Sequence, residues 1–309
     1  MAKLISGLHH VTALASDPQK NVDFYTKVLG LRLVKKTINF DAPDVYHLYY
    51  GDQTGNPGSI MTFFPFPGMY KGKRGSGQLT ITGFSISADS IDFWMERLAE
   101  LAIDFQGPTE RWNETVLYLE DPDGIGIELV ANKSDVRVGY ERDDIPAKHA
   151  IKGFHHVQLD VRNKDVTAAL LTNYMNHEPV AEMENRIRLA ANDVSGAYVD
   201  LNVDPNLLRG SEGAGIVHHV AFRTESDETQ LEIKENLRRI GYHSSPVMDR
   251  QYFHSVYFRE PNGILFEIAT DPPGFLVDEE EAALGETLKL PPWEESRRGL
   301  IEKHLVSLT

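Results

Sequence analysis

The sequence of 309 residues contains no cysteine. A chain without thiols cannot form disulfide bonds, cannot hold a metal ion through thiolate ligands and cannot use a cysteine nucleophile. Any metal ion that the protein binds must therefore be held by nitrogen and oxygen atoms. Histidine and carboxylate side chains are the ligands to look for.

Long apolar runs and an excess of positive charge are also missing. No stretch approaches the length that a helix needs to cross a bilayer, and residues 1–4 lead into patterned sequence without a signal-like apolar region. The formal net charge of -15 argues against binding to nucleic acid or to an anionic membrane surface, because like charges repel. We expect a cytoplasmic protein whose partner is a small molecule.

The chain does contain an internal repeat. The residues Gly-Leu-His-His-Val at 7–11 align with similar residues at 153–157 and at 216–220. A second landmark aligns 118–129 with 257–268 and matches Pro, Gly, Ile and Glu in a single register. Repetition at this period indicates a fold that is built from several similar units.

The first unit gives the order of elements within a repeat. An alternating run at 9–14 predicts a strand, and the sequence Ser16, Asp17, Pro18 predicts the start of a helix that stops at Gly30. Three further strand-like runs follow, at 32–38, 46–50 and 59–64. The unit is thus predicted to run strand, helix, strand, strand, strand.

Three more units follow. The second begins near Leu79 and closes on a strand at 126–130, but its first strand contains no histidine. The helix of this unit is predicted from apolar residues at helical spacing, namely Ile91, Trp94, Leu98 and Leu101. The third unit spans about 153–203 and the fourth about 215–270. Each of them repeats the order seen in the first unit.

We expect an α+β fold in which four βαβββ units form two half-barrel-paired domains. The predicted N-terminal domain, with units one and two, covers 1–131, and a charged linker at 132–150 follows. The predicted C-terminal domain, with units three and four, covers 151–271. The remaining tail, 272–309, includes an acidic run and a short helix, and is predicted to cover one half of the protein.

Three of the units open on a pair of adjacent histidines. Because side chains alternate between the two faces of a strand, one histidine of each pair points into a curved sheet, and His10, His156 and His219 are the candidates. The closing strand of the fourth unit carries Glu267 within an apolar run, where an ionised carboxylate needs a positive partner. A divalent cation would supply that partner.

Two imidazoles and one carboxylate on one face leave coordination positions open. Such a set suits non-haem Fe(II) that handles O2, although Mn, Zn, Ni or Co could also occupy it. The repeats do not decide which units combine. The ligands are His156, His219 and Glu267 if units three and four pair, and His10, His219 and Glu267 if units one and four pair.

Together these features resemble the vicinal oxygen chelate superfamily, which includes glyoxalases, extradiol dioxygenases and antibiotic-resistance proteins. The resemblance rests on the fourfold unit, on residues 7–12 and on the closing strand that leads from Glu-Pro-Asn-Gly to Glu267. More narrowly, the chain resembles ring-cleaving dioxygenases of hydroquinones, the group that contains chlorohydroquinone and methylhydroquinone dioxygenases. This likeness covers nearly the whole chain, including residues 46–50, 55–58, 71–76 and 290–292.

The resemblance implies an Fe(II)-dependent enzyme that inserts O2 into a hydroquinone-type or catechol-type ring. In the hydroquinone group units one and four combine, which implies His10, His219 and Glu267 as the metal ligands. Four further residues match positions that line the metal site in this group, namely Thr12, His218, Arg250 and Tyr257. His218 or Tyr257 would then move the substrate proton, and Arg250 would stabilise negative charge on oxygen.

Under this pairing, units two and three form another barrel, whose inward polar residues are Glu128, His156 and Asp200. We expect it to hold no metal, and its role stays open. Two other functions use the same fold: a glyoxalase-like isomerase or thiol transferase with Zn, Ni or Mn, and a metal-free protein that binds a drug or a quinone. The full ligand set argues against the metal-free protein. A homo-oligomer formed through sheet edges is an open alternative to a monomer.

Overall fold

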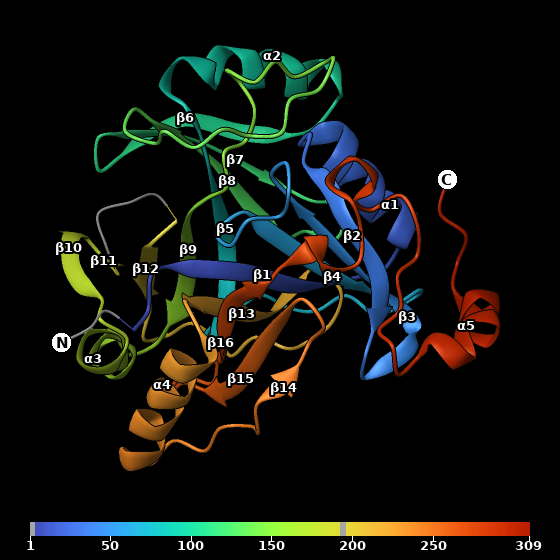
Figure 1. The fold of residues 1–309 in the computed structure, drawn as a ribbon. Coiled ribbons are helices and arrows are strands. Elements are labelled where there is room, and N and C mark those ends of the chain that lie inside the picture. The colour runs from blue at the N-terminus through green and yellow to red at the C-terminus, as the bar shows by residue number, and fades with distance from the viewer. Residues whose placement is uncertain (1–3, 192–195) are drawn as a thin grey trace.

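Two curled sheets of eight strands, with a few helices around them, make up the protein (Figure 1). The structure is a computed structural model and describes residues 4–191 and 196–309. The arrangement confirms the predicted α+β fold of repeated units. Within the described residues, no helix is long and apolar enough to span a membrane.

The first sheet joins the first and the last unit. Its strand order is β14-β15-β16-β13-β1-β4-β3-β2. The first unit contributes β1 (Leu8–Ala15), β2 (Arg32–Asn39), β3 (Ala42–Gly51) and β4 (Ile60–Pro65). The fourth contributes β13 (Ile216–Thr224), β14 (Met248–Asp249), β15 (Phe253–Arg259) and β16 (Leu265–Pro273). The two units meet where β1 pairs antiparallel with β13, which sets Thr12 opposite His219.

The second sheet joins the two middle units in the order β10-β11-β12-β9-β5-β8-β7-β6. The second unit contributes β5 (Gln78–Ser87), β6 (Phe105–Arg111), β7 (Glu114–Glu120) and β8 (Gly126–Asn132). The third contributes β9 (Phe154–Val161), β10 (Glu178–Met183), β11 (Arg186–Ala190) and β12 (Tyr198–Val203). Each sheet therefore takes one unit from 1–131 and one from 151–271. The division of the chain into an N-terminal and a C-terminal domain stays a prediction.

The helices begin where the sequence indicates. The α1 helix (Pro18–Asp23) starts after Asp17, whose carboxylate accepts hydrogen bonds from two backbone N–H groups, and a π-helical turn, η1 (Phe24–Val28), continues it. The remaining helices of the units are η2 (Ala88–Ser90), α2 (Ile91–Glu100), α3 (Lys164–Tyr174) and α4 (Asp227–Arg239). One expected residue differs: α2 ends at Glu100, and Leu101 beyond it is 43% exposed, because its backbone has left the helical face that buries Trp94.

The segment 132–150 is charged but closely packed. It contains no helix and, apart from the end of β8 and one isolated bridge, no strand, although all of it is described. Ile145 is nevertheless buried in the main core. Gly30, at a positive φ of 70°, has no side chain, and a Cβ there would overlap with Ile145. This segment thus stays attached to the first unit as it passes between the units.

Side-chain alternation gives the first sheet two different faces. Val11, Val220 and Phe222 point into the large apolar core that the two sheets share. The residues between them, such as Ala221, point to the other face and belong to a smaller apolar cluster. The polar residues that the sequence predicts at a metal site lie on this second face, so they are kept apart from the main core.

The tail after β16 runs along the first sheet and contains η3 (Phe275–Val277), η4 (Glu281–Ala283), η5 (Glu295–Arg297) and α5 (Arg298–His304) (Figure 1). Its acidic run forms ion pairs with a buried lysine, Lys35. The ammonium group of Lys35, which is fully buried in β2, donates to Asp278 Oδ1 at 2.5 Å, to the Phe275 carbonyl at 3.2 Å and to the Glu279 carboxylate. The tail, which is predicted to cover one half of the protein, thus contacts the first sheet through a buried ion pair.

We expect Lys35→Met to lower the free energy of unfolding by about 3 kcal/mol, because it leaves the buried Glu279 carboxylate without its positive partner. The matched control is Lys27→Met, since Lys27 pairs with Asp23 at 2.7 Å on an exposed helical surface. This control should change the free energy by less than about 0.5 kcal/mol. Urea unfolding followed by tryptophan fluorescence measures both; equal effects would show that the buried ion pair of Lys35 contributes no more to stability than an exposed one.

Candidate metal centre

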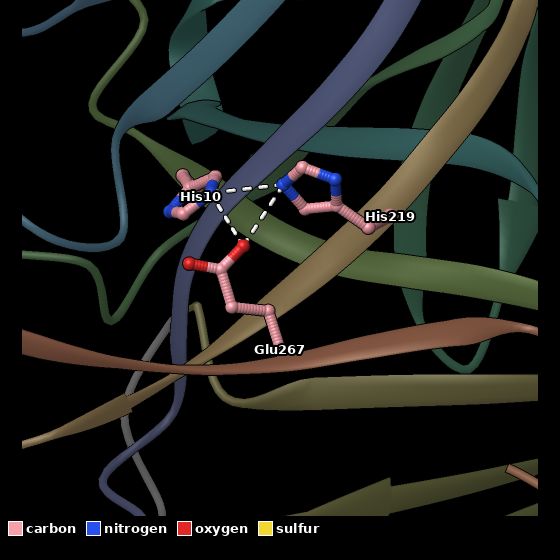
Figure 2. Close-up of side chains that lie close together, drawn as sticks. All are labelled: His10, His219 and Glu267. Atoms are coloured by element: carbon pink, nitrogen blue, oxygen red, sulfur yellow. Dashed lines mark hydrogen bonds and ion pairs between the residues drawn. The ribbon is translucent and has the colours of Figure 1, made fainter. Parts of the chain in front are cut away.

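Three predicted ligands converge on the second face of the first sheet. His10 comes from β1, His219 from β13 and Glu267 from β16, which are neighbouring strands (Figure 2). His10 Nε2 lies 3.2 Å from His219 Nε2 and 3.3 Å from Glu267 Oε2, and His219 Nε2 lies 2.9 Å from the same oxygen. All three side chains are at most 5% exposed. In the described chain, no other three residues bring potential metal-ligand atoms so close together.

The spacing of these atoms fits a shared metal ion. Ligand atoms that sit about 2.1 Å from one ion at right angles are roughly 3 Å apart. Ser255 donates a hydrogen bond to Glu267 Oε1, whereas the buried Oε2 accepts none in the described residues and faces the two imidazoles. Burial by itself would raise the pKa of Glu267, but His10 and His219 lower it well below its usual range. The carboxylate is therefore ionised and available as a ligand.

The first histidine doublet, His9 and His10, determines which ring nitrogen of His10 carries the proton. His9 Nε2 lies 3.1 Å from the carbonyl of Thr270, so this nitrogen must carry a proton and donate it. Burial lowers the pKa of His9 well below its usual value, so the ring is neutral and its Nδ1 is an acceptor. That Nδ1 is 2.9 Å from His10 Nδ1, which must be the donor. His10 Nε2 is left with its lone pair toward the triad, as a metal ligand requires.

The doublet of the fourth unit, His218 and His219, has the same geometry, but its non-ligand ring faces a cavity. His219 Nδ1 lies 2.8 Å from His218 Nδ1. When His219 presents Nε2 to a metal, its Nδ1 donates to His218, whose own proton then sits on Nε2. Desolvation, and after it the neighbouring His219, lower the pKa of His218 to about 4, so the ring is neutral near pH 7. His218 is the exposed member of the pair and faces the cavity.

The other residues named from the sequence lie around the triad. Arg250 Nε donates to the Tyr257 hydroxyl at 3.2 Å, and its guanidinium carbon is 5.3 Å from the centre of the Tyr257 ring. Arg250 also pairs with the exposed Asp41 at 3.2 Å. Burial, and after it Glu267, raise the pKa of Tyr257, so its phenol keeps its proton. Thr12 is fully buried in β1, next to His219 across the strand pair.

A cavity opens above the triad. Its wall contains His10, His219, His218, Arg250 and Tyr257. Sequence reasoning missed the rest of the wall, which consists of Asn39, Phe40, Asp41, His47, Tyr49, Phe64, Phe253 and Leu265. Half of these eight come from the turn between β2 and β3 and from β3 itself, which the repeat landmarks do not include. The mixture of aromatic rings and a few polar groups suits a small aromatic ligand.

The second sheet carries an equivalent site that is built differently. His156 stands opposite Gly83 just as His10 stands opposite Ala221, and Glu128 pairs with Gly83 as Glu267 pairs with Ala221. Ile81 takes the place of His219, so only one of the two equivalent histidine ligand positions carries an imidazole.

Arginines neutralise the carboxylates of the second sheet. Arg111 holds both oxygens of Glu128, with Nη1 at 2.9 Å from Oε1. Arg188 donates to both oxygens of Asp200, at 2.7 and 3.0 Å. His156 Nε2 lies 3.2 Å from Glu128. The structure thus places His156 in the second sheet, in a cluster in which guanidinium groups supply the positive charge.

Comparisons with known proteins agree with this geometry. Residues 7–129 and 145–268 match the family described as the Glyoxalase/Bleomycin resistance protein/Dioxygenase superfamily. A relative from Bacillus subtilis (strain 168), named "Putative ring-cleaving dioxygenase MhqE", is 44% identical over 302 residues, covering 98% of this chain and 99% of its own. The chlorohydroquinone/hydroquinone 1,2-dioxygenase of Sphingobium indicum is 34% identical over 296 residues, covering 93% and 92%.

A solved structure supports the same assignment. The crystal structure of a protein described as a putative dioxygenase from Bacillus subtilis superposes with a TM-score of 0.95 at 42% identity, covering 100% of this chain and 99% of its own. The resemblance to hydroquinone dioxygenases that the sequence indicated is therefore confirmed. With its repeated units, its two curled sheets and these relatives, the chain belongs to the glyoxalase, bleomycin resistance protein and dioxygenase superfamily.

Proposed function

We propose that this protein is a ring-cleaving dioxygenase that inserts both atoms of O2 into a hydroquinone-type ring and uses Fe(II) held by His10, His219 and Glu267. The observation that carries the proposal is the buried triad at the floor of an aromatic-lined cavity. The names of the relatives at 34% and 44% identity support the same reaction class.

The donor set favours a redox metal with open positions. Two neutral imidazoles and one carboxylate on one face form the ligand set that non-haem Fe(II) oxygenases use, although Mn, Zn, Ni or Co fit the same atoms. Fe(II) in this place would supply the path by which an aromatic diol and O2 exchange electrons. Cleavage beside the hydroxyl-bearing carbon turns that carbon into a carboxylate and its neighbour into an aldehyde, so all four oxygens of diol and O2 remain in the product.

The residues of this chain orient the reactants and control charge. Phe64 and Phe253 form the apolar wall against which an aromatic ring can lie. His218 holds its proton on Nε2 and can donate it to a substrate oxygen. Arg250 and the protonated phenol of Tyr257 offer further donors to negative charge that develops on oxygen. Because burial keeps the phenol of Tyr257 protonated and the ring of His218 neutral, both residues act in this proposal as hydrogen-bond donors to substrate oxygen.

The function is tested by oxygen consumption. We expect the full chain, reconstituted anaerobically with Fe(II), to take up one O2 for each molecule of methylhydroquinone added, measured with an oxygen electrode. A glyoxalase-like enzyme would hold the metal without consuming O2. Metal-loaded protein that takes up no O2 with any hydroquinone or catechol would refute the proposal.

Metal retention tests the ligand set separately from turnover. His219→Ala and Glu267→Ala should each lose stoichiometric Fe(II), measured by elemental analysis after anaerobic reconstitution and desalting, because each removes one of three protein ligands. His156→Ala is the matched control, since His156 lies in the second sheet beside Glu128. It should retain the metal, and loss of metal in this control instead of the triad variants would contradict the assigned ligands.

The role of the first doublet leads to a further expectation. His9→Phe should weaken Fe(II) affinity by about 10- to 100-fold, because His10 Nδ1 loses the acceptor that fixes its tautomer. His155→Phe is the matched control, because His155 forms the corresponding contact with His156 at 3.1 Å in the second sheet. Anaerobic competition with a chromophoric chelator measures both affinities. Equal affinities in the two variants would overturn the assigned position of the proton.

A further inference from the structure

Asn39 is a buried polar residue of the cavity wall with an unpaired amide group. It is the last residue of β2, it is 8% exposed, and it lines the cavity above the triad. Its Oδ1 accepts a hydrogen bond from the backbone N–H of Asp41 at 2.9 Å, because the opposite orientation of the amide would set two N–H groups against each other. Nδ2 has no hydrogen-bond partner among the described residues, so its two hydrogens are available at the cavity.

The other polar groups that β3 and the turn before it contribute to the wall have no hydrogen to spare. His47 Nδ1 lies 2.8 Å from the Tyr49 hydroxyl, and His47 Nε2 lies 2.7 Å from the hydroxyl of Thr62, so both ring nitrogens have protein partners. The same contact occupies the Tyr49 hydroxyl. Asp41 carries a carboxylate, which can only accept, and its side chain is 70% exposed. Along this side of the cavity, Asn39 is therefore the described residue that can donate to a ligand.

The curl of the first sheet places Asn39 at the end of the cavity away from the triad. The triad stands on β16, β13 and β1 in the middle of the strand order, whereas Asn39 lies on β2 at one edge. The turn after Asn39 reaches the turn between β14 and β15 at the other edge, where Asp41 pairs with Arg250 at 3.2 Å. Contacts run on from Arg250 through Tyr257 to His219, whose ring centre lies 5.6 Å from that of Tyr257. The two edges of the sheet thus meet over the cavity, and its middle strands form the floor.

The positions of two hydroxyls on a ring decide which of them reaches this end. In a para-diol the second hydroxyl lies across the ring from the first, so a diol with one hydroxyl at the triad directs the other away from the floor. In an ortho-diol the hydroxyls are adjacent, and both stay beside the triad. A site built to hydrogen-bond a hydroxyl discriminates against an analogue that lacks it, because the polar group of the site is then left unpaired.

We propose that Asn39 is a specificity-determining residue that selects para-diols, with its Nδ2 amide donating a hydrogen bond to the hydroxyl that lies across the ring from the triad. This inference rests on the proposed function for the placement of the first hydroxyl. The choice between hydroquinones and catechols is thereby made on β2, away from the three residues that hold the metal.

Ligand binding without turnover tests the contact. The full chain, loaded with redox-inactive Zn(II), is titrated anaerobically by calorimetry with hydroquinone and with phenol, which lacks the second hydroxyl. The Kd for phenol divided by the Kd for hydroquinone should fall about three- to tenfold in Asn39→Ser, the loss of one neutral hydrogen bond. Serine keeps an oxygen that can accept from the Asp41 N–H, so the turn is retained. The corresponding ratio of phenol to catechol should not change, because no catechol hydroxyl reaches Asn39.

Asn185→Ser is the matched control. Asn185 is exposed in the turn between β10 and β11, which is the turn of the third unit that corresponds to the one after Asn39. Both ratios should equal those of the unmodified protein. Zinc content and melting temperature, measured for every variant, exclude loss of metal or of folding as the cause. An unchanged ratio of phenol to hydroquinone in Asn39→Ser, or an equal fall in the ratio of phenol to catechol, would overturn the role of Asn39.

The failure of this inference can be told apart from the failure of the proposed function. Oxygen uptake tests the reaction, whereas the titrations require no O2. Protein that binds hydroquinone with the expected dependence on Asn39 but consumes no O2 would refute the reaction and leave the specificity in place. Zinc-loaded protein that does not bind hydroquinone, or binds it no more tightly than phenol, would overturn the inference about Asn39 whatever the outcome of the oxygen assay.

Discussion

A carboxylate that is buried in the protein needs a compensating positive charge, and this requirement organises three parts of the molecule. Lys35 supplies the charge for Glu279 of the tail, and Arg111 supplies it for Glu128 of the second sheet. Glu267 has no lysine or arginine as an ion-pair partner among the described residues, and two imidazoles face its oxygen instead. The two sheets thus compensate their buried carboxylates differently, with guanidinium groups in the second sheet and two imidazoles in the first.

The histidine doublets connect strand geometry to proton position. Regular alternation would send adjacent side chains to opposite sides of a strand, and the sequence pattern therefore predicts that only one histidine of each pair points inward. Each doublet instead lies at an irregularity in its strand pairing, so both histidines point away from the main core and their Nδ1 atoms lie within hydrogen-bonding distance. In the first doublet His9 donates a hydrogen bond to a backbone carbonyl, and in the unit-three doublet His155 lies 3.1 Å from the carboxylate of Glu114. In the fourth unit the corresponding histidine, His218, faces the cavity instead. The same local motif therefore serves to orient a ligand in one unit and to present a donor in another.

Much of the fold could be predicted because the repeat landmarks mark both ends of each unit. The sequence also identified the three residues that the structure brings together at the triad. It could not decide between His10 and His156 as partner of His219, since the doublets are locally equivalent; only the pairing of β1 with β13, and the family resemblance, separates them. The rest of the cavity wall was missed because residues such as Phe40 and His47 lie in a turn and a strand without a repeated pattern.

The pairing of β1 with β13 also determines the order in which the molecule can be assembled during synthesis. All eight strands of the second sheet lie between residues 78 and 203, so this sheet can complete its pairing before the last unit leaves the ribosome. The first unit, although made earliest, must wait with one side of β1 unpaired until β13 arrives. The oldest strand of the nascent chain and one of the youngest thus close the metal centre together, after the rest of the scaffold is in place.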